Sequence, residues 1–154
     1  MTDRPVCGID VGITGGLALL YDDRVHAVDM PVVDGEVDVD ALVLVLRNVK
    51  PRLVVIEDVH SMPRDGVKQA FSLGNSLGSV RAAVAACGIP HRRISPQRWK
   101  KHFGLIKQDK EAARALAIQT WPGAECFSRK RDHNRAESAL LAKYGADVIE
   151  VRAG

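Results

Sequence analysis

The sequence lacks the features of a secreted, membrane-spanning or zinc-binding protein. Its 154 residues contain three cysteines, Cys7, Cys87 and Cys126, an odd number without metal-ligand spacing. We interpret them as reduced thiols of a cytoplasmic protein. No apolar run approaches the roughly 20 residues that span a bilayer, and residues 1–4 do not form a signal-peptide pattern. With no linker or low-complexity tract, the composition predicts one folded domain, residues 1–154, with no membrane association.

The hydrophobic pattern predicts a mixed α/β sheet with helices on both faces. Apolar runs predict strands at residues 5–10, 16–21, 24–30, 53–57 and 89–94. Helical periodicity and start signals predict helices at residues 40–49, 67–87, 109–119 and 133–144, with a short one beginning at Ser95-Pro96 and Gly145 ending the last. Four consecutive apolar residues at 53–56 are typical of a central strand covered on both faces.

Two glycines, Gly74 and Gly78, lie four residues apart on one face of the helix predicted over residues 67–87. Glycine inside a helix costs about 1 kcal/mol relative to alanine, so we expect another backbone to approach closely there. That neighbour would be a core strand, a partner subunit or DNA.

Three acidic residues occupy the positions where ligands bind in α/β folds. Asp10 and Glu57 each end a predicted strand, and Glu137 lies in the first turns of the last predicted helix. Carboxylates at the ends of parallel strands point into the crevice where open α/β sheets bind ligands. Three of them would repel one another unless a cation held them, and oxygen ligands suit Mg²⁺ or Mn²⁺. The pattern indicates metal-dependent phosphate chemistry.

The charge distribution predicts a polyanionic partner. Net charge is only +3, but acidic residues concentrate in residues 22–40 and basic residues in the second half. Candidate phosphate contacts, which position DNA without reading its sequence, are Lys100, Lys101, Lys107, Lys110, Arg129, Lys130 and Arg131. For Trp99 we favour core packing over stacking on DNA.

The order of elements and acids resembles the RNase H-like superfamily. Within it, the chain is similar to RuvC-type Holliday junction resolvases, particularly small phage versions. The stretches that carry the likeness are residues 8–16, 55–59, 95–100 and 135–141, which span almost the whole chain in the expected order.

The resemblance implies a mixed five-stranded sheet flanked by helices on both faces. It also implies a homodimer that binds four-way DNA junctions and makes paired, symmetric nicks with two Mg²⁺ or Mn²⁺ ions. Asp10, Glu57 and Glu137 fall on metal-binding catalytic positions of the family. A phage-encoded member would act in the cytoplasm of its bacterial host.

The sequence departs from the family pattern in two places. The fourth metal ligand normally lies three residues before the last acid, at Asn134 here, and a neutral amide is a poor magnesium ligand. We therefore favour Asp132 or His133 as the fourth catalytic group. His60 occupies the position of a base-stacking aromatic residue; imidazole stacks on bases more weakly than a larger ring.

Three alternatives remain open. The residues from Asp10 to Gly15 also resemble the phosphate loop of actin-like ATPases, but those need two lobes, and a second loop at 74–78 would fall in a predicted helix. A non-catalytic junction-binding protein would fit Asn134 but not three intact acids. An endonuclease of the same fold acting on flaps, other branched DNA or RNA fits equally well.

Overall fold

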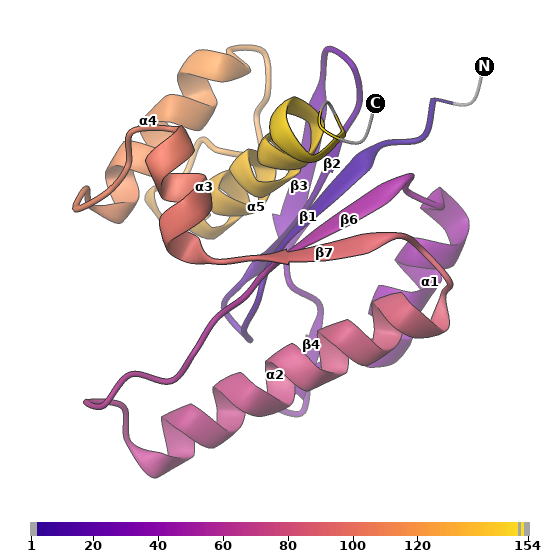
Figure 1. The fold of residues 1–154 in the computed structure, drawn as a ribbon, viewed down its shortest axis with the longest axis vertical. Coiled ribbons are helices and arrows are strands. Elements are labelled where there is room, and N and C mark those ends of the chain that lie inside the picture. Colours follow the sequence, from indigo (N-terminus) through magenta and orange to yellow (C-terminus); the bar gives the residue numbers. More distant parts are fainter. Residues whose placement is uncertain (1–2, 151, 153–154) are drawn as a thin grey trace.

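The computed structural model describes residues 3–150 and 152, and its centre is one mixed sheet (Figure 1). The sheet runs in the order β3-β2-β1-β6-β7. Its strands are β1 (Val6–Asp10), β2 (Gly16–Leu20), β3 (Val25–Asp29), β6 (Leu53–Glu57) and β7 (His91–Ile94). Strands β1, β6 and β7 are parallel, whereas β2 is antiparallel to both β1 and β3. The predicted five-stranded mixed sheet is confirmed.

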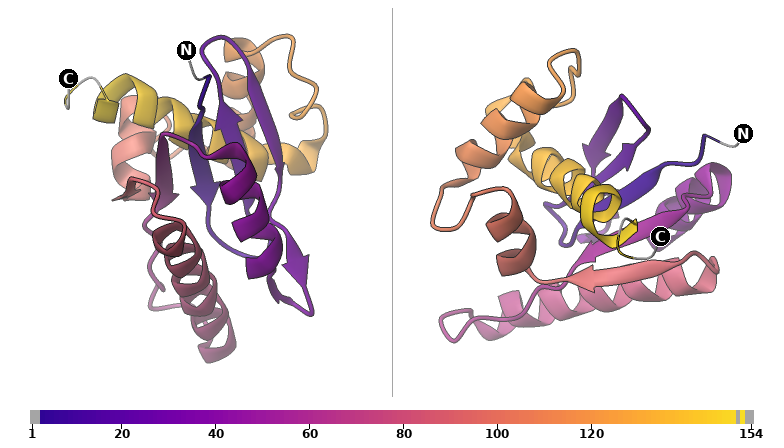
Figure 2. Two further views of the ribbon diagram at one scale, coloured as in Figure 1. Left: turned by 90° about the vertical axis from the view of Figure 1, so that its right-hand side faces the viewer. Right: turned by 45° about the horizontal axis from the view of Figure 1, so that its top comes forward.

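Helices cover both faces of the sheet, as predicted (Figures 1 and 2). One layer contains α1 (Val39–Val49) and α2 (Val67–Ala86). The other layer contains α3 (Pro96–His102), α4 (Lys110–Thr120) and α5 (His133–Tyr144). A 3₁₀ turn, η1 (Lys130–Asp132), leads into α5. The described residues contain no helix with the length and apolar character required to cross a bilayer.

Strand alternation divides the core into two layers. On β1, Val6 packs in the cluster that includes α4 and α5, whereas Cys7 packs in the cluster of α1 and α2. On β6, Val55 belongs to the α5 cluster and Val54 to the α2 cluster. Because successive side chains point to opposite faces, every second residue of β1 and β6 faces α5.

The close approach of α5 to the sheet depends on glycine. A Cβ atom on Gly8 would overlap the backbone oxygen of Ser138 and lie 2.6 Å from the backbone nitrogen of Ala142. A Cβ atom on Gly16 would lie 2.8 Å from the backbone oxygen of Asn134. Gly8 and Gly16 therefore let α5 lie directly on β1 and β2 along most of its length.

Two features go beyond the predicted elements. A small hairpin of β4 (Val32–Val33) and β5 (Glu36–Val37) is formed around Asp34 and Gly35, whose φ angles are +51° and +76°. Asp-Gly is the typical sequence of a two-residue hairpin turn with positive φ at both positions. The last α-helix ends at Tyr144 with Gly145 as its C-cap, as predicted, but the chain then continues as the π-helical segment η2 (Gly145–Glu150). Gly145 is also a packing residue, since a Cβ there would lie 2.6 Å from Val55 Cγ2.

Gly74 and Gly78 have no close neighbour among the described residues. A Cβ atom on either would meet nothing within 4 Å. The expectation that a core strand of this chain approaches them is therefore wrong, because this face of α2 is open to solvent. A partner subunit or DNA remains as the predicted neighbour.

Candidate functional site

Asp10 and Glu57 lie at the carboxyl ends of the adjacent parallel strands β1 and β6. Asp10 lies four residues after Val6 on β1, and Glu57 lies two residues after Val55 on β6. Side chains an even number of residues apart point to the same face of a sheet, so both carboxylates point toward the α5 layer, as Val6 and Val55 do. Each residue is only 7% exposed. The fold therefore buries two neighbouring acids on one face of the sheet.

Glu137 reaches the same place from the first turns of α5. Its carboxylate lies close enough to repel both Asp10 and Glu57, which helps to raise the pKa of each. The contact of α5 with Gly8 and Gly16 brings Glu137 this close to the strand ends. The three acids predicted from the sequence therefore come together.

The environment of Asp10 and Glu57 disfavours their ionised forms. Burial, followed by repulsion from Glu57 and Glu137, raises the pKa of Asp10 well above its ordinary value, while Lys110 acts in the opposite direction. Burial and then repulsion from Glu137 raise the pKa of Glu57, and the hydrogen bond from Trp99 and the charge of Lys100 oppose this rise. A bound cation would relieve both the repulsion and the desolvation cost.

The three acids interact pairwise. Across residues 3–150 and 152, no three His, Cys, Asp or Glu side chains surround a common point where one ion could sit. Asp10 is nevertheless repelled by both Glu57 and Glu137, and Glu137 also repels Glu57. The geometry therefore offers pairs of neighbouring carboxylates.

Glu57 is held by a buried indole. Trp99 Nε1 donates a 2.8 Å hydrogen bond to Glu57 Oε2, and Trp99 is fully buried. Trp99 lies in α3, whose start is fixed by Ser95 as N-cap and Pro96 at the first helical position. The expectation that Trp99 belongs to the core is confirmed, but the sequence did not reveal that its N–H group orients an acid of the site.

Two lysines flank the cluster. Lys100 follows Trp99 in α3, its ammonium group 5.5 Å from the indole centroid, and its charge lowers the pKa of Glu57. Lys110 begins α4, and its charge lowers the pKa of Asp10. Both cations therefore lie within electrostatic reach of the acids.

Asp132 has a different environment from the three acids. Its Oδ1 accepts hydrogen bonds of 2.7 and 3.0 Å from the Arg129 guanidinium, and its Oδ2 accepts one of 2.8 Å from the Arg129 backbone nitrogen. Burial acts to raise the pKa of Asp132, but the Arg129 hydrogen bonds and the charge of Arg135 outweigh it, so the pKa is lowered. Both oxygens thus have partners in the capping box of η1, the turn that leads into α5. This arrangement gives no support to Asp132 as a metal ligand, and it gives Arg129 an internal role as well.

His133 and Asn134 line a cavity of about 500 Å³ beside the loop that follows β1. The same cavity is lined by Lys110 and Arg131. The Asn134 side-chain amide donates a hydrogen bond to the backbone oxygen of Thr14, which holds this loop against α5. Of Asp132 and His133, the two residues favoured as the fourth catalytic group, His133 lines this cavity. Its catalytic role remains a prediction.

The other predicted DNA contacts occupy separate places. His60 and Lys107 are exposed, and so is Lys130 in η1. Lys101 is exposed on α3 and lines a different cavity from that of Arg131. The structure therefore places Lys100 and Lys110 near the acids, Arg131 in the cavity that Lys110 also lines, and Lys101 elsewhere.

Asp58 is an acid that the sequence did not single out. It follows Glu57, and its Oδ1 is buried without a hydrogen bond, 3.6 Å from the Arg93 guanidinium of β7. Its Oδ2 lies 3.8 Å from His60 Nε2. The sequence offered a sign of Asp58, because it directly follows the strand-end acid Glu57. However, successive side chains of a strand point to opposite faces, so Asp58 points away from Glu57.

Comparison with known proteins gives the fold. No protein-family model matches the chain, and no curated protein matches it. A structure of Thermus thermophilus RuvC is similar over 92% of this chain and 94% of its own, with a TM-score of 0.64 and 23% identity. The structure described as T. thermophilus RuvC in complex with Holliday junction substrate is similar over 93% and 94%, with a TM-score of 0.62 and 22% identity. The chain therefore has the RNase H-like fold of RuvC, which confirms the resemblance at the level of the fold.

Proposed function

We propose that this chain is a metal-dependent endodeoxyribonuclease that resolves Holliday junctions by paired, symmetric nicks. The convergence of Asp10, Glu57 and Glu137 at one end of the sheet carries the proposal. The substrate class is supported by the fold, because RuvC, which has the same fold, has been solved with a Holliday junction substrate.

The donor set fits Mg²⁺ or Mn²⁺. All three acids offer carboxylate oxygens, which hard divalent cations select. Asp10 lies close enough to Glu57 and Glu137 for their charges to raise its pKa, so these three acids would hold the ions. When bound, the ions would supply an activated water and stabilise the oxygen that leaves the phosphorus.

The chain's own side chains prepare the site. The Trp99 N–H fixes Glu57 Oε2, so this acid keeps one orientation before substrate arrives. Lys100 and Lys110 bring positive charge to the edge of the acid cluster, where they would bind phosphate oxygens of the cut strand. His133, open to the neighbouring cavity, would move a proton at its imidazole nitrogen during hydrolysis.

Symmetric nicking requires two copies of the site. The open face of α2 offers an interface, because Val67 is 89% and Phe71 75% exposed beside Gly74 and Gly78. Spacings of four, three and four residues place these side chains on one helical stripe. We therefore assign the homodimer contact to this stripe, which we call the α2 stripe.

The ATPase alternative is weaker. Its second phosphate loop would fall at residues 74–78, which lie in the middle of the continuous helix α2. A flap or branched-DNA endonuclease shares the acid site, so substrate geometry must decide between it and a resolvase.

The test uses a labelled synthetic four-way junction, a 5′ flap and a linear duplex, each with Mg²⁺, Mn²⁺ or EDTA. Asp10→Asn is the inactive comparison, and Asp40→Asn, an exposed first-turn acid of α1, is the matched control. We expect metal-dependent paired nicks in the junction alone, lost in Asp10→Asn and kept in Asp40→Asn.

Other outcomes have definite meanings. Equal cutting of flap and junction would replace the resolvase with a branched-DNA endonuclease. Tight junction binding without cutting in either metal would make the chain a non-catalytic junction-binding protein.

A further inference from the structure

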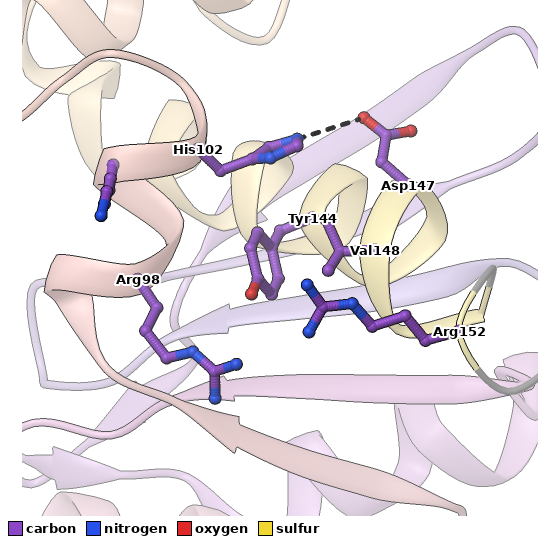
Figure 3. A pocket seen from close by; sticks show the side chains of 7 residues that line it. Arg98, His102, Tyr144, Asp147, Val148 and Arg152 are labelled. Atoms are coloured by element: carbon purple, nitrogen blue, oxygen red, sulfur yellow. Dashed lines mark ion pairs between the residues drawn. The ribbon is translucent and has the colours of Figure 1, made fainter.

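A second basic cavity lies at the far end of α5 from the acid cluster. It lies open to solvent between α3, the end of α5 and η2 (Figure 3). Its volume is about 670 Å³. Its lining residues are Arg98, Lys101, His102, Tyr144, Asp147, Val148 and Arg152.

The cations of this cavity have no acidic partner among the described residues. Arg98, Lys101 and Arg152 are exposed and take part in none of the ion pairs formed by residues 3–150 and 152. The acid of the lining, Asp147, has its Oδ2 3.0 Å from Lys143 Nζ and 3.9 Å from His102 Nε2. The positive charge of the cavity is therefore uncompensated.

The cavity continues as an elongated groove toward the sheet edge. A neighbouring hollow of about 290 Å³ shares Arg98, Tyr144 and Arg152 and adds Arg92 of the edge strand β7. Figure 3 shows Arg98 and Arg152 on either side of Tyr144. Three guanidinium groups from separate segments thus border one continuous groove, which we call the α3–η2 groove.

We propose that the α3–η2 groove binds backbone phosphates of a DNA arm at a distance from the scissile phosphate. Guanidinium groups suit phosphate because they donate two parallel hydrogen bonds to its oxygens. An elongated, solvent-open row of cations fits successive phosphates of a polymer better than a single small anion. This inference rests on the proposed function, because the arm belongs to the branched substrate.

The spacing along α5 fits this assignment. Glu137 and Tyr144 are seven residues apart, so at 1.5 Å per residue the groove begins about 10 Å along the helix axis from the acid cluster. Successive phosphates on one strand are spaced about 3.4 Å along the duplex axis. The groove would therefore contact an arm about three or more base pairs from the scissile phosphate.

The test measures how DNA affinity depends on salt. Arg98→Gln, Arg152→Gln and the double variant are placed in the Asp10→Asn background, and binding to a four-way junction is measured in EDTA. Arg47→Gln, an exposed arginine of α1 on the opposite face of the sheet, is the matched control. Each lost phosphate contact lowers the slope of log affinity against log salt by about 0.9, so the double variant should lose about 1.8 and the control nothing.

Binding to a linear duplex and titration with inorganic phosphate distinguish the failure of this proposal from the failure of the proposed function. If the parent binds the junction but the double variant keeps its slope, the groove assignment is overturned and the proposed function stands. If the parent binds neither junction nor duplex, both are overturned. Titration with inorganic phosphate gives the third case: weakened phosphate binding in the double variant with an unchanged DNA slope would assign the groove to a small anion and overturn the DNA-arm proposal.

Discussion

Trp99→Phe removes the hydrogen bond that orients Glu57 while keeping an aromatic ring in the core. The lost donor lies 2.8 Å from a carboxylate oxygen, and both residues are buried. A hydrogen bond to a charged group contributes about 1.5–3 kcal/mol, so we expect the free energy of unfolding to fall by about this amount at neutral pH, beyond the packing loss.

The pH dependence distinguishes the lost hydrogen bond from lost packing. The pKa of Glu57 is raised above its ordinary 4.5, so its contribution to stability is full below pH 4.5 and is lost as pH rises through the folded-state pKa. The Trp99 hydrogen bond lowers this pKa, so Trp99→Phe should raise it further. The difference in stability between the variant and wild type should therefore grow as pH rises from 4.5 toward 8.

The assay is urea unfolding of the metal-free protein across this pH range. Trp121→Phe is the matched control, because Trp121 is also buried and packs on Phe127 with ring centroids 6.1 Å apart, and its indole forms no hydrogen bond with the described residues. Its destabilisation should be independent of pH. The same pH-independent loss in Trp99→Phe would refute the reasoning.

Three further predictions follow from the site and its surroundings. Asp10→Asn should raise the melting temperature of the metal-free protein at neutral pH, because it removes a buried carboxylate whose pKa is raised. Scanning fluorimetry in EDTA measures this gain, which should vanish as the pH falls toward the ordinary pKa of an aspartate. Arg129→Gln should destabilise the protein at neutral pH, and progressively less as the pH falls through the lowered pKa of Asp132. In denaturant titrations, a loss of stability that stays the same from pH 7 to pH 3 would contradict the stabilising role of the Arg129–Asp132 hydrogen bonds. Phe71→Glu should convert the proposed homodimer into a folded monomer, because it places a charge on the α2 stripe. Sedimentation velocity measures the mass, and an unchanged dimer mass would show that the interface lies elsewhere.

The sequence predicted the parts of the fold that depend on local patterns. Apolar runs marked the strands, and their ends located Asp10 and Glu57 because strand alternation and parallel pairing leave little freedom at the carboxyl ends. The 3.6-residue period placed Glu137 near the start of α5. These positions follow from periodicity alone.

Contacts between distant residues were not predictable in the same way. The hydrogen bond between Trp99 and Glu57 joins residues 42 positions apart, and no local pattern specifies it. The sequence predicted Gly145 as the end of the last helix, and it is the C-cap of α5, but its packing against Val55 across the core follows no local pattern. The pairing of Arg129 with Asp132 could have been predicted from the sequence, since the two residues have the i, i+3 spacing of a capping box.

The central claim is that Asp10, Glu57 and Glu137 hold divalent cations, and calorimetric titration of the DNA-free protein with Mn²⁺ tests it most directly. We predict two ions per chain with release of protons, because metal binding requires ionised carboxylates and the pKa values of Asp10 and Glu57 are raised. Asp10→Asn should weaken both sites, Glu57→Gln or Glu137→Gln only one, and Asp40→Asn neither. Binding of Mn²⁺ by Asp10→Asn with the stoichiometry and affinity of the wild type would contradict the account.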